Sequence, residues 1–161
     1  MNKNSFSHLN KKGRAQMVDI SSKAMTQREA VASGQVIIGP DAFNLLVDGK
    51  ILKGDVMAVA RIAGIMAAKK VGCLIPLCHP LTLQNIEIDF TLNPEKNAIE
   101  ILARAKAKGA TGVEMEVLTA VSIAALTIYD MCKSREKNIT IEKIQLDYKA
   151  GGKSGTWKRK I

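Results

Sequence analysis

The sequence feature that most constrains the fold is the run GVEMEVLTAVSIAALTIYDMCK at residues 112–133. It contains no proline and is rich in Leu, Ala and Met, so it is predicted to form a long α-helix. Glu114 and Glu116 fall in its first turn, where they suit the positive end of the helix dipole, and Lys133 suits the negative end. A helix this apolar is expected to be covered on most sides, by its own core or by another subunit.

The polar residues of this helix fall on one side. At about 100° per residue they lie within an arc of roughly 140°, and almost everything outside the arc is apolar. Such a stripe is either a solvated edge or the wall of a polar pocket. A solvated edge is the more common case, but the interruption of the stripe by Ile123 and Leu126 weakens it. The stripe consists of Glu116, Thr119, Ser122, Thr127, Asp130 and Lys133.

The remaining strong patterns predict one further long helix, at 54–70, and several strands. Residues 85–92 and 98–107 alternate apolar and polar side chains and are predicted to form an antiparallel pair with one wet face. Residues 36–38 and 139–149 are predicted to be further strands. The order strand, helix, strand, strand, helix, strand is that of an α+β, ferredoxin-like (split βαβ) fold, an antiparallel sheet with its helices packed on one face.

The connecting segments carry weaker signals. Residues 15–20 are predicted to form a short first strand, and 22–34 an ordered connection without regular structure. Asp41 is predicted to cap a short helix that ends near Val47. Residues 73–80, CLIPLCHP, contain two prolines four residues apart and are predicted to be extended.

Composition and charge limit the classes of protein to which the chain can belong. A chain of 161 residues with 47% hydrophobic residues is predicted to be a single domain, 1–161, with flexible ends at 1–14 and 150–161. The net charge of +9 indicates an anionic partner, although aromatic residues at 4% weigh against nucleic acid. No apolar run approaches the roughly 20 residues of a bilayer span, and three scattered cysteines fit the cytoplasm.

His79 is one of only two histidines and lies between Pro76 and Pro80, beside Cys78. A zinc site is disfavoured because the chain lacks paired Cys or His spacings. A structural histidine is the common alternative, but the rigid proline frame favours a side chain held to meet a ligand. A nucleophilic pair with Cys78 is also disfavoured, because adjacent residues on a strand point to opposite faces.

The glycine-rich segment 151–155, GGKSG, contains the Gly-Lys-Ser of a phosphate-binding loop. The full pattern fails, because Asp147 stands where the leading glycine is needed and no helix follows. Two interpretations stay open: a flexible loop that folds round an anion, or a loose tail.

Asp130 and Lys133 lie one helical turn apart, as either a surface ion pair or an acid/base pair. If Lys53, Lys149 and Lys153 gathered at the same pocket, their repulsion would lower lysine pKa values, and the cluster would bind a polyphosphate.

Several long motifs together resemble the MoaC-type family, the cyclic pyranopterin monophosphate synthases of molybdenum cofactor biosynthesis. The similarity covers almost the whole chain, with the motifs in the family's order. They are MVDIS at 17–21, KGDV at 53–56, RIAGIMAAK at 61–69, LIPLCHP at 74–80, TGVEME at 111–116, ALTIYDMCK at 125–133 and KAGGKSG at 149–155.

The resemblance implies a ferredoxin-like subunit in a homohexamer, a trimer of dimers with active sites at subunit interfaces. It implies a lyase that converts cyclised dihydroguanosine triphosphate to cyclic pyranopterin monophosphate with release of pyrophosphate. No cofactor is implied, whether Mg²⁺ accompanies the triphosphate is left open, and neither nucleic acid nor a membrane is an implied partner. The alternatives are a basic nucleic-acid-binding module and an inactive nucleotide-binding scaffold.

Carried over by position, the family's catalytic residues fall on Asp130, Lys53 and Lys133. Where the family commonly has a basic residue before Thr-Gly this chain has Ala110, for which Lys108 could substitute. The substrate-binding residues implied by the resemblance are Leu77, Cys78, His79, Met115, Glu116, Glu114, Arg28, Lys149 and Lys153.

Overall fold

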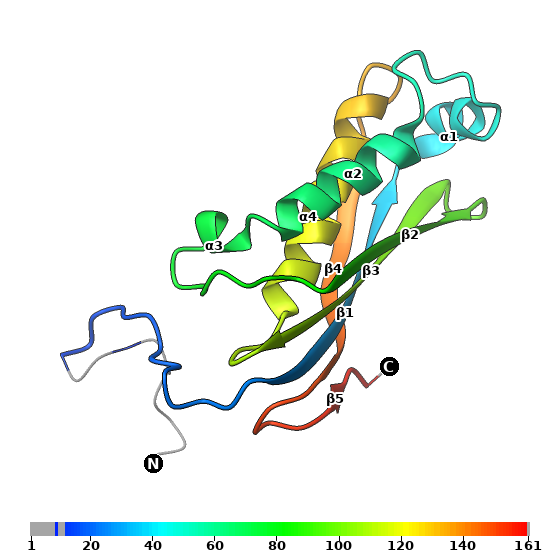
Figure 1. Cartoon of the computed structure of the whole chain (residues 1–161). Coiled ribbons are helices and arrows are strands. Elements are labelled where there is room, and N and C mark those ends of the chain that lie inside the picture. Colours follow the sequence, from blue (N-terminus) through cyan, green and yellow to red (C-terminus); the bar gives the residue numbers. More distant parts are fainter. Residues whose placement is uncertain (1–8, 10–11, 161) are drawn as a thin grey trace.

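A computed structural model describes residues 9 and 12–160 of the chain, and all five strands belong to one antiparallel sheet. In Figure 1 the two long helices lie side by side on one face of this sheet. The sheet order is β2-β3-β1-β4-β5. The strands are β1 (Thr26–Ile37), β2 (Asn85–Asn93), β3 (Ala98–Gly109), β4 (Thr140–Ala150) and β5 (Trp157–Lys158), and the helices are α1 (Gly39–Val47), α2 (Val56–Ala68), α3 (Val71–Leu74) and α4 (Glu114–Cys132).

The first four strands and helices α2 and α4 confirm the predicted α+β, ferredoxin-like arrangement. β1 and β3 occupy the middle of the four-strand order, as expected for a split βαβ unit, and β5 extends the edge beside β4. The helix predicted at 54–70 is α2, and the side chain of Asp55 caps it by accepting a hydrogen bond from the main-chain N–H of Ala58.

Helix α4 provides much of the core. Val117, Val121 and Ile128 on this helix have no exposed surface, and the helix lies across β1, β3 and β4. Its approach to its neighbours is close at two glycines. A Cβ on Gly34 of β1 would lie 2.6 Å from Val121, and one on Gly64 of α2 would lie 2.8 Å from the carbonyl oxygen of Ala120.

The 19 residues of α4 are also apolar enough, by length and composition, to cross a membrane. This differs from the expectation that no apolar run approaches that length. However, half of the relevant window is buried within the protein, because the helix packs against both the sheet and α2. Core helices of globular proteins pass the same test.

The prediction that residues 22–34 lack regular structure is wrong, because β1 is a strand of twelve residues that begins at Thr26. Its inward positions include the small residues Ala30 and Ala32, which are fully buried, and Gly34. Small residues alternating with polar ones give a weak apolar pattern, although the close approach of α4 requires them.

Three other local predictions need correction. Residues 15–20 form no strand: Ala15 makes only an isolated bridge with Leu9. Asp41 lies in the first turn of α1, and Ile38 occupies the cap without a side-chain hydrogen bond. Residues 73 and 74 end the short helix α3, so the segment 73–80 is extended only in part.

The structure describes little of the first predicted flexible end and nearly all of the second. Most of segment 1–14 lies outside the described residues. In the C-terminal segment, Trp157 and Lys158 form β5 and pair with β4, and the guanidinium of Arg159 lies 5.8 Å from the centre of the Trp157 ring.

An irregularity in β4 places a functional side chain. Ala32 pairs with Leu146 but Val31 pairs with Tyr148, so Asp147 is an extra residue in β4 at this point. Lys149 then pairs with Ala30, on the face of the sheet that α4 covers. In a regular strand, residues 146 and 149 would point to opposite faces.

Candidate active site

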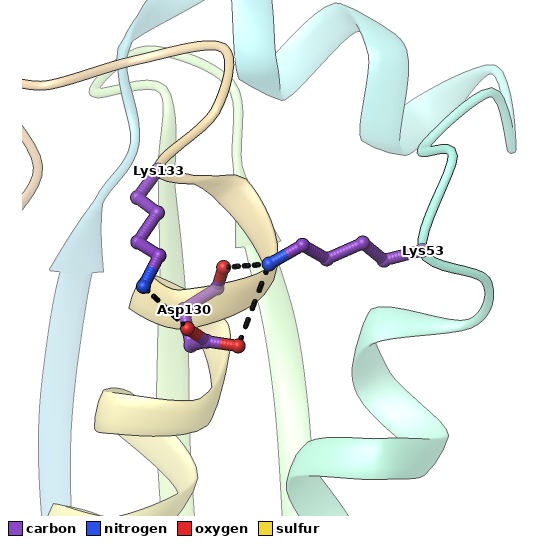
Figure 2. A network of polar contacts seen from close by, with 3 residues as sticks. All are labelled: Lys53, Asp130 and Lys133. Carbon is purple, nitrogen blue, oxygen red and sulfur yellow. Dashed lines mark hydrogen bonds and ion pairs between the residues drawn. The ribbon is translucent and has the colours of Figure 1, made fainter.

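The three predicted catalytic residues meet at the C-terminal end of α4 (Figure 2). Lys133 Nζ lies 2.7 Å from Asp130 Oδ1. Lys53, from the loop before α2, donates a hydrogen bond of 2.6 Å to the main-chain oxygen of Asp130 and lies 3.4 Å from Asp130 Oδ2. The last carbonyls of a helix have no intrahelical partner, so a lysine is well placed there.

The charges of this group stabilise one another. Lys133, followed by Lys53, holds the pKa of Asp130 below its usual value, so the carboxylate is ionised at neutral pH. Asp130 in turn raises the pKa of Lys133. Asp130 is 59% exposed and both lysines are more than two-fifths exposed, so the group lies open to a ligand.

A cavity of about 310 Å³ lies at the opposite, N-terminal end of α4. The cavity is lined by the first turn of α4 and the residues just before it, by the segment before β2, and by part of the segment before β1. Because the segment 75–84 is irregular rather than a strand, Cys78 and His79 line the same cavity, contrary to the prediction that they point apart. The lining residues are Val18, Ile20, Lys23, Leu77, Cys78, His79, Leu81, Thr111, Gly112, Glu114, Met115 and Glu116.

Glu116 is the most unusual titratable group in this cavity. Its side chain is only 3% exposed, and burial raises its pKa to about 7, with the charge of Glu114 adding to the shift. Burial, followed by the charge of Glu116, also raises the pKa of the Cys78 thiol. Cys78 is therefore a neutral thiol at neutral pH, which argues against the nucleophilic pair.

A second, basic cavity of about 350 Å³ lies next to the first. In it, Lys149 Nζ forms an ion pair of 2.7 Å with Glu114 Oε1, and Arg28 Nε donates to the main-chain oxygen of Gly109. Both cavities are lined by Lys23, Thr111, Gly112 and Glu114. The other lining residues of the basic cavity are Arg28, Glu29, Ala110, Lys149, Ala150, Gly151, Lys153 and Ser154.

The glycines of segment 151–155 have a steric role in the basic cavity. Both Gly151 and Gly152 have positive φ, and a Cβ on Gly152 would overlap the guanidinium of Arg28. The loop is thus the support against which Arg28 lies, rather than a phosphate-binding loop of the Gly-Lys-Ser kind.

The structure divides the predicted site residues between the two ends of α4. Glu116 and Asp130 are 14 positions apart, which corresponds to about 21 Å along a helix. Within one chain, Lys53 therefore does not gather with Lys149 and Lys153, and the predicted lowering of lysine pKa values by that cluster does not apply.

The polar stripe of α4 is likewise not one continuous pocket wall within the chain. Ser122 and Thr127, near the middle of the helix, donate hydrogen bonds to the main-chain oxygens of Leu118 and Ile123. Only the two ends of the stripe carry groups that are directed at a ligand site.

Sequence reasoning missed one part of the site. The segment with Val18, Ile20 and Lys23 forms part of the first cavity, although it was predicted to be a strand and a connection. Its only signal was the family motif at 17–21. Ala110 lines the basic cavity, whereas Lys108 is not among the residues that line either cavity, so the suggested substitution by Lys108 has no support.

Fold and site define the class of protein. This is a ferredoxin-like α+β protein with an ionised carboxylate between two lysines, and with a basic cavity beside a cavity lined by both polar and apolar groups. Such an arrangement is typical of an enzyme that carries out acid/base chemistry on an anionic small molecule. The MoaC family model matches residues 17–152, and the chain belongs to this family.

Curated relatives cover nearly the whole chain. The cyclic pyranopterin monophosphate synthase of Chloroflexus aurantiacus strain J-10-fl is 56% identical over 156 residues, which are 97% of this chain and 96% of the relative. The synthase of Heliobacterium modesticaldum is 56% identical over 154 residues, with 96% and 97% covered. The synthase of Thermoanaerobacter pseudethanolicus is 50% identical over 156 residues, with 97% and 99% covered.

Proposed function

We propose that this chain is a cyclic pyranopterin monophosphate synthase. It is a lyase that converts cyclised dihydroguanosine triphosphate to cyclic pyranopterin monophosphate, with release of pyrophosphate, early in molybdenum cofactor biosynthesis. The observation that carries the proposal is that every site residue implied by the family resemblance belongs either to the Asp130 group or to the lining of the two cavities. Membership of the MoaC family and the names of the relatives support the reaction.

The state of charge suggests how the Asp130 group acts. An ionised Asp130 accepts a proton or holds a donor in place, whereas Lys133, whose pKa is raised, is a charged ammonium at neutral pH. We assign Lys133 to proton donation and to stabilising negative charge that develops on the substrate. Lys53 is held against the same carboxylate and shares in this stabilisation.

The two cavities suit different parts of the substrate. The first cavity combines Leu77 and Met115 with polar groups, as a flat heterocycle requires, and the basic cavity offers Arg28 and three lysines to a triphosphate. The conversion is a ring rearrangement with loss of pyrophosphate, so it calls for no redox cofactor. The described residues contain no group of three or more His, Cys, Asp and Glu placed to hold a metal, so Mg²⁺ would enter on the triphosphate.

We also propose that subunits assemble so that the Asp130 group of one chain completes the cavities of another. The separation of about 21 Å along α4 supports this, because one small substrate cannot reach both ends of the helix. Large apolar side chains stay exposed on α2 and α4, as at a surface that another subunit covers. They are Val59, Ile62, Met66 and Leu126. A homohexamer built as a trimer of dimers is our proposal for the complete assembly.

A cytoplasmic location is proposed from the free thiols of Cys73, Cys78 and Cys132, which form no disulfide. The alternative of a nucleic-acid-binding module is not favoured, because the basic residues near the first cavity line a concave site for a small anion. A measurement of turnover distinguishes the enzyme from an inactive nucleotide-binding scaffold.

The direct test measures pyrophosphate release from cyclised dihydroguanosine triphosphate. Release by the natural sequence, largely lost in Asp130→Asn and Lys53→Ala, would support the proposal. Lys50→Ala is the matched control: Lys50 lies three positions from Lys53, pairs with Asp48 and contacts neither cavity. Absence of pyrophosphate release by the natural sequence would refute the proposed enzyme activity.

The composite site is tested by mixing two inactive variants. Asp130→Asn and His79→Ala damage opposite ends of α4, so a mixed dimer would hold one intact and one doubly damaged site. Random reassortment of subunits would restore about a quarter of the original rate. No recovery, after exchange of subunits has been verified by differently tagged chains, would refute a site shared between subunits.

A further inference from the structure

We propose that Lys23 is a substrate-binding residue that holds the phosphate group next to the ring system, at the junction of the two cavities. This inference rests on the proposed function. Of the described residues, four line both cavities, and Lys23 is the only cation among them; the others are Thr111, Gly112 and Glu114. A ligand that extends from one cavity to the other must therefore pass Lys23.

The backbone before Lys23 is held by local hydrogen bonds. Asp19 Oδ1 accepts from the main-chain N–H of Ser21 at 2.9 Å and from its hydroxyl at 2.6 Å, an Asx turn. The main-chain N–H of Lys23 then donates to the oxygen of Ile20, closing a second turn. Val18 and Ile20 in this segment face the first cavity, so the turns direct Lys23 to its rim.

The ammonium of Lys23 is available for an anion. The described residues contain no ion pair or side-chain hydrogen bond of Lys23, whereas the charge of Lys149 is already met by Glu114. Within the basic cavity Lys153 lies on the glycine-rich loop after β4 and does not line the first cavity. Lys153 likewise has no ion pair among the described residues, so the ammonium groups of Lys23 and Lys153 suit successive positions along one polyphosphate chain.

This arrangement divides the phosphates between the two lysines. With the ring in the first cavity, the phosphate attached to the sugar lies at the junction beside Lys23, and the terminal phosphates lie beside Lys153. Lys23 would thus bind the phosphate that stays in the cyclic product, and Lys153 would bind the departing pyrophosphate.

The test measures the binding of two probes, guanosine 5′-monophosphate and inorganic pyrophosphate, by calorimetry on the full chain. Loss of one charge-assisted hydrogen bond weakens affinity about tenfold. We expect Lys23→Met to weaken the binding of the monophosphate about tenfold and the binding of pyrophosphate by less than about twofold. We expect the reverse for Lys153→Met. Lys23→Arg should retain monophosphate binding, because the guanidinium keeps the charge.

Lys108→Met is the matched control, because Lys108 carries the same charge at the end of β3 but lines neither cavity. Monophosphate binding that is unchanged in Lys23→Met, or pyrophosphate binding weakened equally, would overturn the assignment. The same holds if Lys108→Met reproduces the effect, since general attraction of anions would then explain it. Because binding needs no turnover, these outcomes are independent of whether the chain proves to be the synthase.

Discussion

Replacement of Glu116 by glutamine should make the protein more stable at neutral and alkaline pH. Burial raises the pKa of Glu116 from an ordinary value of 4.5 to about 7. Between these values the folded chain keeps a proton that the unfolded chain loses. The free energy of unfolding therefore falls as the pH rises through this window, and the loss is complete above the folded pKa.

The shift corresponds to about 3 kcal/mol, since one pKa unit is worth about 1.4 kcal/mol. Most of that loss falls between pH 5 and pH 8. A neutral glutamine carries no such penalty, so the difference in unfolding free energy between Glu116→Gln and the natural sequence should grow by about 2 to 3 kcal/mol over this range.

Urea unfolding of both proteins at pH 5 and pH 8 measures this difference, with the subunit concentration held fixed because assembly shifts apparent stability. Glu95→Gln, in the exposed turn between β2 and β3, is the control and should show no growth of the difference. If the effect of Glu116→Gln were the same at both pH values, the Glu116 carboxyl would titrate normally and the argument from its burial would be wrong.

Two further predictions concern α4 and its contact with α2. Gly64→Ala in α2 should lower the unfolding free energy by about 1 to 3 kcal/mol, because the new methyl group would lie 2.8 Å from the rigid main-chain oxygen of Ala120 in α4. Urea titration measures this change, and an unchanged midpoint would contradict the close packing. Asp130→Asn should abolish pyrophosphate release yet leave the melting temperature almost unchanged, because its ion pairs are exposed. A large fall in melting temperature would instead give Asp130 a structural role.

The sequence by itself determined the elements with strong periodic signals. The long apolar run predicted α4, the alternation of Ile86, Ile88 and Phe90 with polar residues predicted β2, and the order of such elements gave the ferredoxin-like fold. Family motifs also identified the residues at both ends of α4. These features depend on neighbours in the chain, and local patterns record them directly.

Tertiary structure decided how those residues are distributed in space. Only the last residues of β1 were predicted, because its other inward residues are small, a requirement set by the approach of α4 rather than by the strand itself. The extra residue in β4 turned Lys149 toward Glu114, and a bulge of this kind has no distinct sequence pattern here. Lys23 lies at the junction of the two cavities because the chain before β1 runs past both of them. All three features depend on how segments far apart in sequence come together, including the cavities that the local turns before Lys23 meet, so no local pattern could reveal them.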